Sequence, residues 1–129
     1  MQTRQTVVLL IEENAAVRDA LEQALEREEF RVVPASNGDA LTEQQPYDLA
    51  LIDVNNQRRN SFETFRKLNQ SKPRLPIILI SSQPELLNHP AAARAAARML
   101  KPLEIHLLCR TVRDLTDGLS GPRGQTAAA

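Results

Sequence analysis

The run at residues 48–53 (Asp-Leu-Ala-Leu-Ile-Asp) constrains the fold of this chain most strongly. Four apolar residues stand between two carboxylates, and an apolar run this short is typical of a strand buried on both faces of a parallel sheet. Asp53 then lies at the carboxyl end of that strand, which is the edge of an open parallel sheet where ligands bind. The segment therefore predicts a central strand that ends on a candidate functional carboxylate.

Similar runs recur along the chain and alternate with helical patterns. Further strands are predicted at residues 6–11, 30–34, 77–80 and 99–100, the second of them near a sheet edge because a proline ends it. Apolar residues at helical spacing predict helices at about 15–28, 38–44, 61–70, 91–97 and 105–115, with one helical turn at 84–87. Strand–helix alternation with right-handed crossovers predicts an α/β fold: a doubly wound, five-stranded parallel sheet with helices on both faces.

Length and composition exclude several classes of function. The 129 residues fit one domain, which we place at residues 5–116, with 117–129 as a disordered tail or the start of a linker. A net charge of zero and an aromatic content of 3% argue against a nucleic-acid partner. No apolar run reaches the ~18 residues of a membrane span. The single cysteine, Cys109, fits a reducing compartment. We expect a soluble, cytoplasmic protein.

Polar side chains follow four of the predicted strands: Glu12 and Glu13, Asp53, Ser81, and Lys101. They meet at one sheet edge if every strand is parallel. Three carboxylates in one crevice repel each other unless a cation joins them. Mg²⁺ suits the site because it takes oxygen ligands and is typically held by one or two carboxylates with phosphate oxygens and water. A carboxylate beside a cation, an ammonium and a hydroxyl can attack phosphorus and hold the resulting acyl phosphate.

This pattern resembles the receiver domain of two-component response regulators, over about residues 7–115. The matching segments are Leu-Leu-Ile-Glu-Glu-Asn (9–14), Tyr-Asp-Leu-Ala-Leu-Ile-Asp (47–53), Pro-Ile-Ile-Leu-Ile-Ser-Ser (76–82) and Leu-Lys-Pro-Leu (100–103). The resemblance implies a flavodoxin-like sheet of strand order 2-1-3-4-5, and a sensor histidine kinase or phosphotransfer protein as partner. It also implies homodimerisation through the face between the fourth and fifth helices.

The resemblance implies a role for each matching residue. Asp53 is the expected phospho-acceptor. The expected metal ligands are Glu12, Glu13 and Asp53, together with the backbone carbonyl of Asn55. The expected contacts to the phosphoryl group are the hydroxyl of Ser81, at the switch position, and the ammonium of Lys101.

The sequence departs from the family in two places. Receivers usually have at least one Asp in the acidic pair, whereas this chain has two Glu. Each added methylene moves the carboxylate by more than ~1 Å, and Mg²⁺ needs near-octahedral geometry, so we expect weakened metal binding. Arg58 and Arg59 enter the loop after Asp53 and are candidate stand-ins for the cation. Arg98 occupies the aromatic switch position, so the usual coupling between that position and Ser81 cannot operate unchanged.

Two other functions remain as alternatives. One is a divergent pseudo-receiver that acts as a phosphorylation-independent protein-interaction module. The other is an enzyme such as a phosphoaspartyl phosphatase, which needs a general-acid carboxylate two residues after its nucleophile. That position is Asn55, which cannot protonate a leaving group, so we expect a signalling domain and not an enzyme. No glycine-rich phosphate loop follows any predicted strand, which disfavours a nucleotide-binding protein.

Overall fold

The structure is a computed structural model that describes residues 5–38, 46–55 and 60–120. In chain order its elements are β1 (Val7–Ile11), α1 (Ala15–Arg27), β2 (Arg31–Ala35), β3 (Leu49–Asp53), α2 (Asn60–Ser71), β4 (Ile77–Ser81), α3 (Pro84–Leu87), the 3-10 turn η2 (Pro90–Ala92), β5 (Ala97–Leu100) and α4 (Ile105–Ser120). The strands form one parallel sheet in the order β2-β1-β3-β4-β5, as predicted. No helix in these described ranges is long and apolar enough to cross a membrane.

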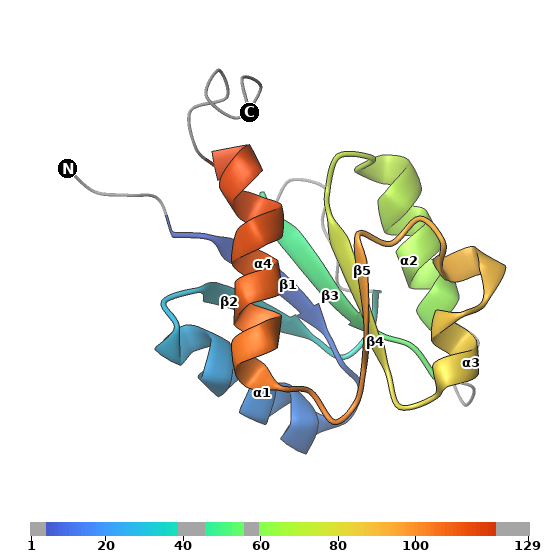
Figure 1. The fold of residues 1–129 in the computed structure, drawn as a ribbon, viewed down its shortest axis with the longest axis horizontal. Coiled ribbons are helices and arrows are strands. Elements are labelled where there is room, and N and C mark those ends of the chain that lie inside the picture. The colour runs from blue at the N-terminus through green and yellow to red at the C-terminus, as the bar shows by residue number, and fades with distance from the viewer. Residues whose placement is uncertain (1–4, 39–45, 56–59, 121–129) are drawn as a thin grey trace.

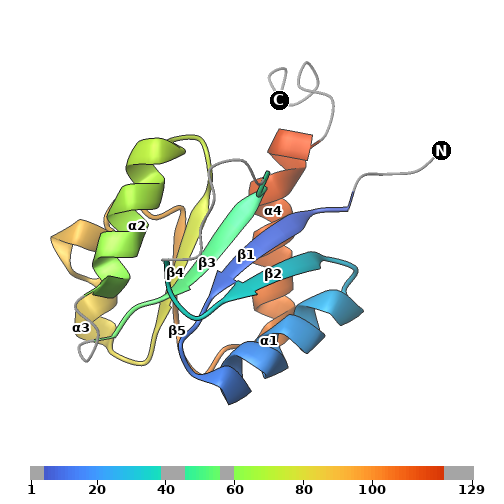
Figure 2. The same ribbon diagram turned by 180° about the vertical axis from the view of Figure 1, so that it is seen from behind.

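Helices cover both faces of the sheet (Figures 1 and 2). Alternate residues of β1 point to opposite faces, as the pleat of a strand requires. Val8 and Leu10 pack in the core formed with α1 and α4, whereas Leu9 and Ile11 pack in the core formed with α2 and α3. Each fully buried side chain of this size contributes about 1.5–3 kcal/mol. The apolar runs of the sequence are therefore the two-sided core of the fold.

Asp48 sets the register between β1 and β3 at the end of the sheet opposite the predicted site. Its backbone N–H donates to the Val7 carbonyl at 2.8 Å, and its carboxylate accepts the Val7 N–H at 2.8 Å. In the resulting register Ile11 pairs with Ile52. Glu12, the residue after β1, and Asp53, the last residue of β3, therefore lie at neighbouring positions.

The predicted helix at residues 91–97 is wrong. The structure has only the turn η2 in this region, and β5 already begins at Ala97. The alanines favour a helix by propensity, but tertiary pairing overrides that preference. The N–H of Ala96 donates to the Ile77 carbonyl at 2.8 Å, and Ala97 pairs with Ile78. The chain must be extended here to form the sheet edge.

The predicted end of the last helix is also too early. We placed the start of a disordered tail at residue 117, but α4 continues to Ser120. The Thr116 hydroxyl donates to the Val112 carbonyl at 2.7 Å within the helix. The glycine at position 118 costs about 1 kcal/mol relative to alanine and does not by itself end a helix. Residues 121–129 and most of the helix predicted at 38–44 lie outside the described residues.

Gly38 lies against Thr64 of α2, where no side chain fits. An added Cβ would lie 2.8 Å from Thr64 Oγ1 and 2.9 Å from its Cγ2. We expect Gly38→Ala to lower the free energy of unfolding by about 1–3 kcal/mol through overpacking. Urea denaturation measures this change. In a Thr64→Ala background, the loss of unfolding free energy caused by Gly38→Ala is expected to fall to less than half of its value in the wild-type background. An equal loss in both backgrounds would rule out this contact as the cause.

Glu104 caps the first turn of α4, just after Lys101. Its carboxylate accepts the N–H groups of His106 at 3.1 Å and Leu107 at 2.8 Å, and these bonds hold the pKa of Glu104 below its ordinary value of 4.5. A lowered folded-state pKa stabilises the protein above pH 4.5, and this contribution is lost as pH falls through the folded pKa.

Glu104→Ala is therefore expected to lower the thermal midpoint at pH 7. The difference from wild type should narrow as the pH approaches about 3. Thermal unfolding followed by circular dichroism across this range checks the prediction. Asp114→Ala, which removes an exposed carboxylate of the same helix, is the control. A Glu104 effect that is independent of pH would contradict a role for the ionised carboxylate.

Candidate functional site

The candidate site lies at the carboxyl edge of the sheet, where β1, β3, β4 and β5 end. Asp53 pairs with Ile80 across the β3–β4 ladder, and Ser81 pairs with Leu100 across the β4–β5 ladder. The N–H of Lys101 then donates to the Ser81 carbonyl at 2.8 Å. The parallel register therefore delivers one polar residue from each of these four strands to the same edge, as predicted.

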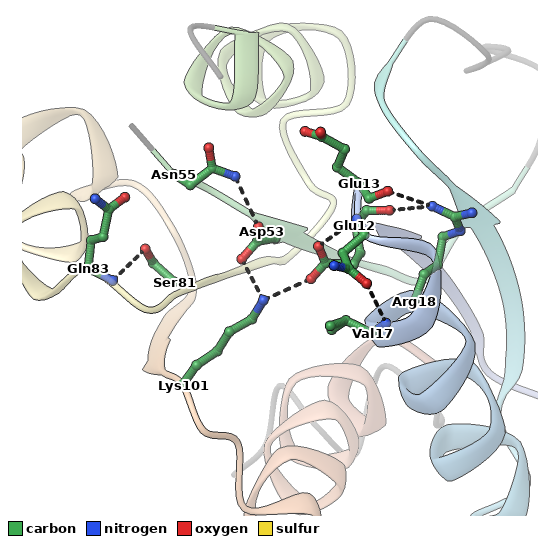
Figure 3. A network of polar contacts seen from close by, with 10 residues as sticks. Glu12, Glu13, Val17, Arg18, Asp53, Asn55, Ser81, Gln83 and Lys101 are labelled. Carbon is green, nitrogen blue, oxygen red and sulfur yellow. Dashed lines mark hydrogen bonds and ion pairs between the residues drawn. The ribbon is translucent and has the colours of Figure 1, made fainter. Parts of the chain in front are cut away.

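Lys101 joins the two carboxylates of the site (Figure 3). Its Nζ lies 2.9 Å from Glu12 Oε1 and 3.0 Å from Asp53 Oδ1. The side chains of Glu12 and Asp53 are only 3% and 8% exposed, and that of Lys101 is 23% exposed. The ion pairs are thus shielded from water. Charge interactions are stronger in such a buried environment than at the protein surface.

One ammonium serves two carboxylates, so these three groups leave one negative charge uncompensated. Burial raises the pKa of Asp53, the hydrogen bond from Lys101 acts to lower it, and the charge of Glu12 raises it further; the net direction is upward. For Lys101, burial acts to lower the pKa, but the hydrogen bonds to Glu12 and Asp53 outweigh burial and raise it. The pocket therefore favours the charged lysine and disfavours the ionised Asp53.

Glu12 and Glu13 face different ways, although they are adjacent in sequence. The second oxygen of Glu12 accepts the Asn14 N–H at 3.2 Å, and Asn14 caps α1 by accepting the Val17 N–H at 3.0 Å. Glu13 is exposed, and Figure 3 shows its carboxylate directed away from the Lys101 ammonium. The structure thus brings Glu12 to Asp53 and Lys101, but not the carboxylate of Glu13.

Asn55 and Ser81 complete the surroundings of Asp53. The Nδ2 of Asn55 donates to Asp53 Oδ2 at 3.4 Å, a side-chain contact that the sequence did not predict. Ser81 is fully buried, and its hydroxyl oxygen accepts the N–H of Gln83, the N-cap of α3, at 3.0 Å. This contact leaves the hydroxyl proton of Ser81 for donation to another acceptor.

Two arginines near the site contact backbone carbonyls. Arg98, the divergent switch position, donates from Nη1 to the Leu87 carbonyl at the end of α3, at 3.2 Å. Arg18 of α1 donates to the carbonyls of Glu12 and Glu13, and sequence analysis missed it. The sequence did carry one signal for Arg18. A cation in the first turn of a helix opposes the helix dipole, so it needs a specific partner to be stable there. Arg58 and Arg59 lie outside the described residues.

The donor set fits a magnesium ion held by few protein ligands. Among the described residues, no group of three His, Cys, Asp or Glu side chains is arranged to hold a metal. However, Glu12 and Asp53 approach the same ammonium and carry excess negative charge, and Mg²⁺ usually takes one or two carboxylates and keeps several waters. The residues that fit this role are Glu12 and Asp53, with Asn55 beside them.

Comparisons with known proteins agree with this fold. The family model for the response regulator receiver domain matches residues 8–113. The transcriptional regulatory protein ResD of Bacillus subtilis is 32% identical over 90 residues, which cover 67% of this chain and 37% of ResD. The transcriptional regulatory protein AfsQ1 of Streptomyces coelicolor is 32% identical over 112 residues, 82% of this chain and 49% of AfsQ1. The chain thus spans less than half the length of either relative.

Solved structures show the same fold at low sequence identity. The response regulator TrrA of Thermotoga maritima, in complex with Mg²⁺-BeF, superposes with a TM-score of 0.79 at 19% identity, covering 86% of this chain and 99% of that one. A receiver domain protein of Methanospirillum hungatei gives a TM-score of 0.77 at 21% identity, covering 88% of this chain and 95% of that one.

Fold and site together define a doubly wound parallel α/β domain whose acidic pocket contains a lysine between two carboxylates. The chain belongs to the family of response regulator receiver domains of two-component signal transduction.

The pocket makes a prediction about stability. We expect Asp53→Asn to raise the free energy of unfolding by roughly 0.5–2 kcal/mol, because it removes one of two buried carboxylates that compete for the Lys101 ammonium. Urea denaturation at pH 7 measures the change. Glu13→Gln, at an exposed carboxylate directed away from Lys101, is the matched control and should change stability by less than about 0.5 kcal/mol. Destabilisation by Asp53→Asn would show that its attraction to Lys101 exceeds its burial cost.

Proposed function

We propose that Asp53 accepts a phosphoryl group from a histidine kinase or a phosphotransfer protein. The observation that carries this proposal is the placement of the Lys101 ammonium between Asp53 and Glu12. A buried carboxylate with a raised pKa, next to a fixed cation, is typical of a functional site and not of a surface ion pair. Membership of the receiver family supports the same role.

The residues have distinct tasks in this transfer. An Asp53 carboxylate oxygen attacks phosphorus, and an O–P bond forms as the P–N bond of the donor phosphohistidine breaks. Lys101 neutralises charge on the transferred phosphoryl oxygens, and the Ser81 hydroxyl, whose proton is not used in its contact with Gln83, donates to one of them. Glu12 and Asp53, with Asn55 beside them, would hold Mg²⁺, which would supply positive charge to the transferring group. Glu13 joins this set only if its side chain changes rotamer.

This role also bears on the bounds of the domain, its mode of signalling, its compartment and its dimer face. We propose that the receiver domain extends from residue 5 to the end of α4 at Ser120, and that the chain signals through partners and does not act as an enzyme. The buried thiol of Cys109 fits the reducing cytoplasm where such partners act. The dimer face expected from the family would have to use α3 and η2, because η2 ends at Ala92 and residues 93–96 form no helix before β5.

The direct test is incubation with a small-molecule phosphodonor and Mg²⁺, followed by intact-mass measurement. We expect the wild type to gain the mass of one phosphoryl group and Asp53→Asn to gain none. Lys101→Met is expected to slow the gain by about tenfold to a hundredfold, because a charge-assisted hydrogen bond contributes about 1.5–3 kcal/mol.

A matched pair of variants tests the metal ligands in the same assay. Glu12→Gln should raise the Mg²⁺ concentration needed for half-maximal phosphorylation several-fold more than Glu13→Gln, because only Glu12 lies beside Asp53. Phosphate gain on another residue, or an inert wild type, would contradict the proposal. The inert result would favour the phosphorylation-independent interaction module, and repeated hydrolysis of a phosphoester would favour an enzyme.

A further inference from the structure

The segment between α3 and β5 has the sequence of a helix, although it forms only one 3-10 turn (Figure 1). Six of the residues 91–97 are alanine, which has the highest helix propensity. Pro90 precedes them, and proline suits the first turn of a helix because its φ is fixed near the helical value. Even so, η2 ends at Ala92 and β5 begins at Ala97. Local preference and tertiary structure therefore disagree here, and natural sequences keep such conflicts mainly at functional sites.

The start of a longer helix is already built. His89 is the N-cap of η2: its Nδ1 accepts the Ala91 N–H at 3.0 Å, and its ring centroid lies 5.4 Å from that of Phe62 in α2. Three N–H groups donate to the carbonyl three residues earlier, at 2.9, 3.1 and 3.1 Å: those of Ala92, Ala93 and Ala95. Nucleation is the costly step of helix formation, so a longer helix here needs only elongation.

One backbone group decides whether the helix continues. The N–H of Ala96 donates to the Ile77 carbonyl at 2.8 Å and so attaches this segment to β4. In an α-helix the same N–H would donate to the Ala92 carbonyl, four residues earlier. It cannot do both, so elongation of η2 and this contact with β4 exclude each other. The Ala97–Ile78 pair is the next along the ladder and would open with it.

Few other contacts separate the two arrangements. β5 is an edge strand of four residues, so it is paired along one side only. Ala92 is fully buried and stays in the helix in both arrangements, whereas Ala95 and Ala97 are only partly buried. The exposed members of the segment, which have little buried surface to lose, are Ala93, Arg94 and Ala96. Segments with few buried contacts open at a lower free energy than the core of a sheet.

We propose that residues 90–97 form a two-state element, in which η2 elongates into an α-helix as the bond between Ala96 and Ile77 opens. Arg98, the residue of β5 that follows this element, donates to the Leu87 carbonyl of α3 at 3.2 Å. The change of state therefore alters the surface that α3 and β5 share. A partner that binds this surface better in one state would select that state. The inference does not depend on phosphorylation of Asp53.

Nuclear magnetic resonance on the full chain tests this element. Relaxation dispersion and saturation transfer detect a minor state that exchanges within microseconds to milliseconds, and they give its chemical shifts. In the wild type we expect exchange at Ala96 and Ala97, with minor-state Cα shifts at helical values and a population of about 0.1–10%. Absence of exchange at both residues overturns the inference. Minor-state shifts at random-coil values also overturn it, because the sheet edge would then open without forming a helix.

Two variants at exposed positions form a matched pair. Glycine disfavours a helical position about fivefold relative to alanine. Ala96 lies outside η2 and becomes helical only in the minor state, so Ala96→Gly is expected to lower the minor-state population about fivefold. Ala93 already has right-handed helical dihedrals, so Ala93→Gly penalises both states and should change that population less than about twofold. An unchanged population in Ala96→Gly, or an equal fall in both variants, overturns the inference.

Discussion

The sharing of one ammonium between two buried carboxylates is the interaction on which this site depends. Lys101 arrives from β5, Asp53 from β3 and Glu12 from β1, so the contact ties together three strands of the sheet. Removing the ammonium from such a buried arrangement is costly because it leaves two carboxylates uncompensated. With two carboxylates and one ammonium, the arrangement carries one excess negative charge. This excess charge favours the binding of a cation in the pocket.

The sheet and most of the site could be predicted from the sequence, because both depend on short-range patterns. Apolar runs of four or five residues identify the strands, and a parallel sheet necessarily gathers the residues that follow them. The alanine-rich segment at 91–97 was misjudged because helix propensity is local, whereas the pairing of Ala97 with Ile78 is not. Nor could the sequence show that Glu12 is buried against Lys101 whereas Glu13 is exposed, since that depends on how the chain bends after β1.

The extra methylene of glutamate has two effects in this pocket. The first, expected from the sequence, is on the geometry of metal binding. The structure shows a second effect: the longer side chain of Glu12 reaches the Lys101 ammonium with one oxygen and the Asn14 N–H with the other. The two glutamates of the acidic pair therefore have different environments. The carboxylate of Glu12 is part of the buried site, whereas that of Glu13 lies at the surface.

The single turn of α3 gives the region after β4 an unusual mechanical property. Its first residue follows Gln83, whose N–H is bound by the Ser81 hydroxyl, and its last carbonyl is bound by Arg98. A helix of four residues has no interior, and a first turn is costly to nucleate alone. One helical turn therefore links the hydroxyl at the end of β4 to the guanidinium that β5 carries, and no longer element stands between these two contacts.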